Sequence, residues 1–119
     1  MKLRPIKLED VFIPEFNGNR GLPRDEQITV EIKSHMSPFQ ITKNKRFIRR
    51  GAETIVEYDD AVIFLNHVGK ISNLEDGHSV KIIDGIALLD SKDKRLYDLV
   101  IEIRNYLFTA GEEMEPGEN

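Results

Sequence analysis

Residues 11–33 read VFIPEFNGNRGLPRDEQITVEIK and place two extended runs on either side of a dense centre of turn-forming residues. The first run, Val-Phe-Ile, ends at Pro14, and a proline at this place indicates a short strand at the edge of a sheet. The second run, 28–33, alternates β-branched residues with polar ones, which is typical of a half-buried strand. The stretch therefore predicts two strands that can pair antiparallel across a linker too long for a tight hairpin.

The centre of this stretch has the residue types of either a ligand loop or a structural turn. The pair Asn17-Gly18 favours a turn, because both residues tolerate positive φ. A phosphate cradle would lead directly into a helix, whereas Pro23 and a strand follow here. A structural turn is therefore favoured, with its polar residues fixing the loop or contacting a partner. This candidate loop motif comprises Asn17, Gly18, Asn19, Arg20, Glu26 and Gln27.

The next part of the chain is less regular. Residues 39–50 follow no single period, which leaves open a hairpin with its turn near Lys43-Asn44 or a loop. Residues 53–68 predict a helix that Asp59 or Asp60 caps and that Gly69 ends. The apolar stripe of this helix comprises Tyr58, Ala61, Val62, Leu65 and Val68, and Ile63 and Phe64 widen it.

The C-terminal half contains the clearest element. Asp76-Gly77 predicts a small β excursion or structured loop, and Asp84-Gly85 opens a short helical segment. Residues 93–108 predict an amphipathic helix, with Ser91 or Asp93 as N-cap and Gly111 as its end. The expected buried face is Leu96, Leu99, Val100, Ile103 and Leu107, and the expected polar face is Asp98, Glu102, Arg104 and Asn105.

Together these elements predict an α+β fold, with a β-rich N-terminal third and a mainly helical C-terminal half. We expect a single small domain over 1–111 and a disordered acidic tail over 112–119. The chain has no cysteine, which excludes disulfides, thiolate zinc sites and a cysteine nucleophile. No secretory signal or spanning segment is apparent, so we expect a cytoplasmic protein.

No residue set predicts catalysis. The three histidines, His35, His67 and His78, lack metal-ligand spacing, and no nucleophile motif is present. We therefore expect no enzyme activity, no metal and no cofactor.

Charge is unevenly distributed along the chain. Residues 37–52 carry five basic and no acidic side chains, whereas residues 53–119 carry six basic and fifteen acidic ones. Such separation is compatible with self-association through opposite patches, and a homo-oligomer is one expectation. The basic patch could instead contact nucleic acid, although the sequence pI of about 5.4 argues against this. The patch comprises Lys43, Lys45, Arg46, Arg49 and Arg50.

The two long predicted helices carry more apolar width than one small core needs. This excess indicates a protein partner or an oligomer interface. The candidate protein-binding residues are Tyr58, Phe64, Leu65, Tyr97, Ile101, Tyr106 and Phe108.

Several stretches resemble small proteins of the tail-assembly modules of tailed phages and prophages. They are IPEFNGNRGLPRDEQITVEIK (13–33), HVGKISNLEDG (67–77), IIDG (82–85), ALLD (87–90) and RLYDLVIEIRNYL (95–107). The group that they resemble is the tail assembly chaperones, or a neighbouring small protein of the same module. The resemblance implies a non-enzymatic protein of the host cytoplasm that binds the tape-measure protein and presents it to tail-tube subunits.

Two alternatives remain at this point. One is a structural virion component, either a tail terminator or a head–tail connector. The other is a small nucleic-acid-binding regulator that uses residues 43–50. No membrane partner is expected.

Overall fold

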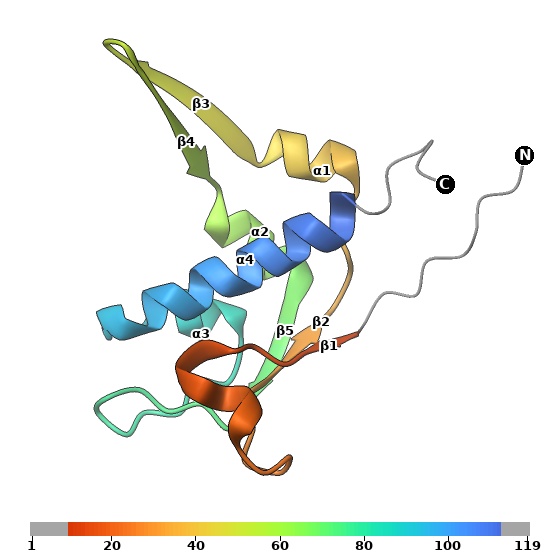
Figure 1. The fold of residues 1–119 in the computed structure, drawn as a ribbon, viewed down its shortest axis with the longest axis vertical. Helices are drawn as coiled ribbons and strands as arrows, with labels where there is room; N and C mark the ends of the chain where they lie inside the picture. The colour runs from red at the N-terminus through yellow and green to blue at the C-terminus, as the bar shows by residue number, and fades with distance from the viewer. Residues whose placement is uncertain (1–9, 113–119) are drawn as a thin grey trace, which may run out of the picture.

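Two antiparallel β-structures and four α-helices make up residues 10–112, the part of the chain that this computed structural model describes (Figure 1). One sheet has the order β1-β2-β5, with β1 (Val11–Phe12), β2 (Thr29–Ile32) and β5 (Val68–Ser72). The other is a hairpin of β3 (Lys45–Arg50) and β4 (Glu53–Tyr58). The helices are α1 (Pro38–Lys43), α2 (Asp60–His67), α3 (Gly85–Asp90) and α4 (Tyr97–Glu112), with the short 3-10 helices η1 (Phe16–Gly21) and η2 (Lys94–Leu96). The α+β class is confirmed, although strands extend through two thirds of the chain rather than one third.

The three-stranded sheet agrees with the expectation for residues 11–33. Strand β1 lies at the edge and pairs antiparallel with β2, Val11 opposite Glu31. Strand β2 also pairs antiparallel with β5. Val30 and Ile32 are buried while Glu31 between them is exposed, so the alternation marks the two faces of β2 as predicted.

Residues 37–58 differ from the expectation. A short helix, α1, precedes the hairpin, and a capping box between Ser37 and Gln40 starts it. The hairpin turns at Gly51-Ala52 rather than near Lys43-Asn44. Gly51 adopts a φ of 62°, which glycine accommodates without steric cost.

The helix expected over 53–68 begins only at Asp60, because residues 53–58 form strand β4. Asp59 caps it, as predicted, by accepting a hydrogen bond from the Val62 amide. Gly69 does not end the helix. The backbone is already extended one residue earlier, where the chain enters β5.

The inward face of α2 also differs from the expected stripe. Ile63 and Phe64 are fully buried, whereas Val62 and Leu65 are exposed. The helix packs on β5 and α3 through the face that was expected only to widen the stripe. An apolar helix face is thus left on the surface.

The C-terminal helix is close to its prediction. Asp93 caps the 3-10 turn that leads into α4, and the helix continues through Gly111 to Glu112 instead of ending at the glycine. The predicted buried face is confirmed at all five positions, Leu96, Leu99, Val100, Ile103 and Leu107. The predicted polar face is wrong at Arg104, which is buried, and Glu102 is half-buried. Apart from Glu112, the expected tail lies outside the described residues.

Helix α4 crosses the molecule and joins its separate parts (Figure 1). The Tyr106 ring stacks on Phe12 of β1 with 4.2 Å between ring centroids. The Arg104 guanidinium binds both carboxylate oxygens of Asp60 on α2, at 3.0 and 2.8 Å. The β3–β4 hairpin projects from one end of this body, and the loops around residues 22–27 and 73–83 lie at the other end.

Candidate functional site

The buried side chain of Asn19 organises the loop between β1 and β2. Its Nδ2 donates to the carbonyl oxygens of Pro14 and Ile28, at 2.9 and 3.0 Å, and its Oδ1 accepts from the Ile28 amide at 2.6 Å. One amide side chain therefore satisfies three backbone groups that the loop leaves without a sheet partner. Asn19 is 1% exposed, so it is not available to a ligand or a partner.

Arg20 and Gln27 close the loop from its outer side. The Arg20 Nε donates to the Ile13 carbonyl at 2.8 Å, and its guanidinium forms a 2.6 Å ion pair with Glu15. The Gln27 amide donates to the carbonyls of Arg20 and Leu22, both at 3.2 Å. Both side chains therefore hold the loop through its backbone carbonyls.

A carboxylate from α4 accepts hydrogen bonds from the backbone amides at the start of η1. The amides of Glu15 and Phe16 donate to the two oxygens of Glu102, at 2.6 and 3.0 Å. Asn17 and Gly18 then reverse the chain with φ values of 49° and 72°. Because the protein's own carboxylate takes the position of an anion here, the loop is a structural turn, as the sequence favoured.

The aromatic members of the candidate protein-binding set lie mostly in the core. Phe64 and Phe108 are buried, and the Tyr58 ring lies 5.4 Å from that of Phe108. Tyr106 is half-buried against Phe12. Burial places Phe64 and Phe108 in the packing of the body and not on a surface that a partner could contact.

The remaining three members of that set are on the surface or close to it, in two places. Leu65 on α2 is 57% exposed, and Tyr97 at the start of α4 is 58% exposed. Ile101 is half-buried, one turn further along α4. Leu65 and Tyr97 line different hollows, so the structure does not bring the predicted set together as one platform.

Leu65 belongs to a hollow between the end of α2, the start of β5 and the start of α3, called here the α2–α3 hollow. Its volume is about 410 Å³. Three exposed aliphatic side chains line it, namely Leu65, Ile83 and Ile86, together with the rim lysines Lys33 and Lys70. Exposed aliphatic residues that gather around one hollow make this place a candidate interaction surface.

Ile83 and Ile86 were not among the predicted site residues. The pair Ile82-Ile83 carried a usable signal, because neighbouring side chains in an extended segment point to opposite sides. Ile82 is buried and Ile83 is 61% exposed. Nothing in the sequence indicated that Leu65 would line the same hollow as Ile83 and Ile86, because the apolar stripe that contains Leu65 is equally typical of a buried helix face.

The basic patch lies on the β3–β4 hairpin and the end of α1. Arg46 and Arg50 stand directly opposite Glu57 and Glu53 across the two strands. Within residues 10–110 none of the five cations of the patch forms an ion pair. Lys45 instead places its ammonium 5.1 Å from the centre of the Phe108 ring, a cation–π contact at the base of the hairpin.

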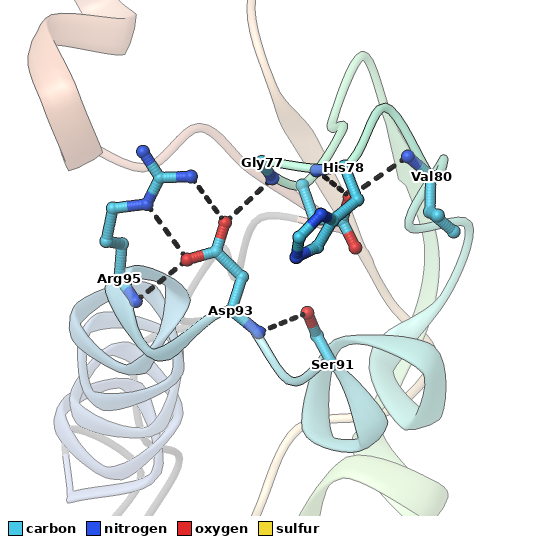
Figure 2. Close-up of polar contacts among 7 residues, drawn as sticks. Gly77, His78, Val80, Ser91, Asp93 and Arg95 are labelled. Atoms are coloured by element: carbon cyan, nitrogen blue, oxygen red, sulfur yellow. Dashed lines mark hydrogen bonds and ion pairs between the residues drawn. The ribbon is translucent and has the colours of Figure 1, made fainter.

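Asp93 ties the loop before α3 to the start of α4, as Figure 2 shows. The Arg95 guanidinium donates to both of its oxygens, at 2.9 and 2.7 Å, and the Gly77 amide donates at 2.7 Å. These hydrogen bonds, the one from the Arg95 side chain first, hold the pKa of the Asp93 carboxyl well below its usual range. Asp76 caps the same loop by accepting from the amides of His78 and Val80.

Other kinds of site find no support among the described residues. Within 10–112 no three His, Cys, Asp or Glu side chains are grouped so that they could hold a metal ion. His67 is buried, and its ring nitrogen contacts the backbone and hydroxyl oxygens of Ser34. None of the helices in this part of the chain has the length and apolar character needed to cross a membrane.

Comparisons with known proteins give no relative. Neither a protein-family model, nor a curated protein, nor a solved structure matches this chain.

Proposed function

We propose that this protein is a non-enzymatic assembly protein that binds other proteins through the α2–α3 hollow. The observation that carries the proposal is the exposure of Leu65, Ile83 and Ile86 around one hollow. Full burial of an exposed Leu or Ile side chain contributes roughly 1.5–3 kcal/mol, and because these three are 40–61% exposed, roughly half of that free energy is still to be gained at each. A partner that covers all three recovers this free energy.

The surroundings of the hollow define the chemistry of a suitable partner. Lys33 and Lys70 lie on its rim, and Lys33 donates to the Leu65 carbonyl at 2.6 Å. Asp84 also lines the hollow, and its carboxylate caps α3 by accepting from the Ala87 amide. The two lysines leave a positive excess, so an apolar segment that carries a carboxylate fits better than a basic one.

The resemblance of several stretches to tail assembly chaperones narrows the proposed partner to phage tail proteins. In that group the partner is the long tape-measure protein, which the chaperone keeps soluble and presents to tail-tube subunits. An apolar surface of the kind found on α2 and α3 suits this task, because insoluble chains expose apolar segments.

Co-expression with a protein of tape-measure length from the genes that neighbour this one tests the proposal. We expect the unmodified protein to bring the long protein into the soluble fraction. The Leu65→Arg variant keeps a good helix former on α2 but places a third positive charge at the hollow, and should lose this effect. The proposal fails if the long protein is equally insoluble with and without the unmodified chain.

A matched control is Phe39→Arg on α1. Phe39 is 74% exposed and does not line the α2–α3 hollow, so its variant should solubilise the partner as well as the unmodified protein does. Mass spectrometry of finished phage particles then separates a chaperone from a structural virion subunit. A chaperone is absent from the particles, whereas a stoichiometric amount there replaces this proposal with the structural one.

A further inference from the structure

The β3–β4 hairpin receives little support from its own chain. Each strand has six residues, and the hairpin projects away from the body (Figure 1). Its contacts with the core are at its base, where Lys45 and Tyr58 lie against Phe108. An isolated two-stranded hairpin is marginally stable in water, so a second surface that covers it would stabilise it.

One face of the hairpin combines exposed apolar area with uncompensated positive charge. Directly opposite residues of an antiparallel pair lie on the same face, so Lys45, Phe47 and Arg49 share a face with Tyr58, Val56 and Thr54. These six residues, called here the cationic face, include no carboxylate. Phe47 in the middle is 70% exposed, and Val56 opposite it is 38% exposed.

The other face of the hairpin balances its own charges. Arg46 and Arg50 stand opposite Glu57 and Glu53 there, and Ile48 lies between the two arginines. The attraction of the hairpin for an acidic surface is therefore concentrated on the cationic face.

The opposite end of the molecule carries a hollow of complementary character. Its volume is about 550 Å³, and its lining includes three carboxylates, one ammonium group and an exposed aliphatic side chain. These are Asp25, Glu26, Glu75, Lys81 and Ile83, and together they define the acidic hollow. No ion pair among residues 10–110 involves its three carboxylates.

We propose that the cationic face of one copy docks into the acidic hollow of a second copy. Phe47 meets Ile83, and the exposed Arg49, two residues and about 7 Å further along the strand, meets the carboxylates of the hollow, while Lys45 stays against the Phe108 ring. The hairpin and the loops that line the hollow lie at opposite ends of the molecule (Figure 1), so one copy cannot fill its own hollow. The contact joins unlike surfaces, and repetition of it produces a ring or an open chain of copies.

The size and charge of the contact determine how the association behaves. The six side chains of the cationic face cover less than the roughly 800 Å² per partner that stable interfaces bury. Association is therefore reversible and increases with protein concentration. It also weakens with added salt, because exposed charges are screened within about 10 Å at 0.1 M salt.

Light scattering after size-exclusion chromatography, on the purified full chain alone, tests the proposal. The average mass should rise above that of the monomer with concentration and fall again when salt is raised from roughly 0.05 to 0.5 M. Arg49→Glu in the hairpin and Glu26→Lys in the hollow should each weaken association about tenfold or more. Lys92→Glu reverses an exposed charge outside both surfaces and should leave the mass unchanged.

Mixing the two interface variants provides the decisive measurement. In an equimolar mixture of Arg49→Glu and Glu26→Lys, unmodified surfaces meet each other and the reversed charges attract, so association should return. This recovery also shows that both variants are folded. A monomeric mass for the unmodified protein up to about 0.5 mM overturns the proposal, as does a mixture that stays monomeric.

Adding a DNA duplex to the unmodified protein tests whether the cationic face binds nucleic acid instead of a second copy. Salt-sensitive binding of the duplex to a protein that stays monomeric, lost in Arg49→Glu, assigns the face to nucleic acid and overturns the proposal. These measurements use the purified chain without a partner, so their failure is distinct from a failure of the co-expression test.

Discussion

Replacing Asn19 by alanine tests whether one side chain holds the loop between β1 and β2. The change removes both hydrogen bonds that its Nδ2 donates, to Pro14 and Ile28, and the one that its Oδ1 accepts from the Ile28 amide. Pro14 is itself buried, so water cannot easily replace the lost donor at its carbonyl. Alanine also leaves the space of the amide group empty.

The expected loss follows from the number of hydrogen bonds. A net contribution of about 1 kcal/mol for each of three bonds gives a loss of about 3 kcal/mol in the free energy of unfolding. The stability of a domain is roughly 5–15 kcal/mol, so this loss is a large part of the total. Asn19→Asp should cost at least as much at neutral pH, because it retains the acceptor but places a carboxylate next to two carbonyl oxygens.

Urea unfolding monitored by circular dichroism measures both variants, and the aspartate variant adds a test by pH. Burial raises the pKa of the introduced carboxyl, so its folded form binds a proton more readily than its unfolded form does. The stability deficit of Asn19→Asp relative to the unmodified protein should therefore shrink as the pH falls. The deficit of Asn19→Ala should stay constant with pH, because alanine does not titrate.

Asn105→Ala on the exposed side of α4 is the control, and its stability should lie within about 0.5 kcal/mol of the unmodified protein. A change of equally small size for Asn19→Ala would refute the reasoning, since the hydrogen bonds of this loop would then contribute nothing net.

Three further substitutions test the packing of the body. Gly85→Ala should cost about 1–3 kcal/mol in thermal or urea unfolding, because an added Cβ would lie 2.8–2.9 Å from side-chain atoms of Val68; an unchanged midpoint would contradict this close approach. Arg104→Ala should cost about 2 kcal/mol by urea unfolding, less than a fully buried pair because its carboxylate partner is 24% exposed; no loss would mean that the pair is energetically neutral. Asp93→Asn should make the free energy of unfolding less sensitive to acid. The lowered pKa of Asp93 contributes stability that is present above its ordinary value of 3.8 and is lost as the pH falls below that value. Equal acid sensitivity in both proteins would show that the contact with Arg95 does not bias the titration.

The sequence predicted those elements whose hydrophobic pattern fits only one type of secondary structure and one buried face. Strand β2 alternates strictly, and α4 carries a single apolar face, so both were found with the correct buried residues. The buried Arg104 was the exception on α4. A guanidinium pairs with a carboxylate from another helix, and spacing within α4 contains no information about Asp60.

Two predictions were wrong because the hydrophobic pattern fits more than one structure, namely the start of α2 and its buried face. Residues 53–58, Glu-Thr-Ile-Val-Glu-Tyr, alternate in places as a strand does, but their apolar members also continue the helical stripe of the following segment. The helix α2 has two overlapping apolar faces, and only its packing on β5 and α3 decides that Phe64 is buried and Leu65 is exposed. Helix α1 was missed although Ser37 and Gln40 have the spacing of a capping box.

The candidate site could be predicted only in part for a similar reason. Arg20 and Gln27 lie within seven residues of the carbonyls that they bind, so a role within the loop could be inferred from the local sequence. The α2–α3 hollow joins Leu65 to Ile83 and Ile86, about twenty residues later, and depends on how α2 and α3 meet. Surfaces that form between distant elements need the tertiary structure.

The bond between Glu102 and the amides of Glu15 and Phe16 spans 86–87 residues of sequence, and this separation affects the order of folding. During synthesis the N-terminal loop leaves the ribosome long before the carboxylate that completes it. The ring of Phe12 is likewise synthesised long before Tyr106, on which it stacks. The emerging chain therefore passes through a period in which its first strand and loop have only their local hydrogen bonds, and the contacts with α4 form last.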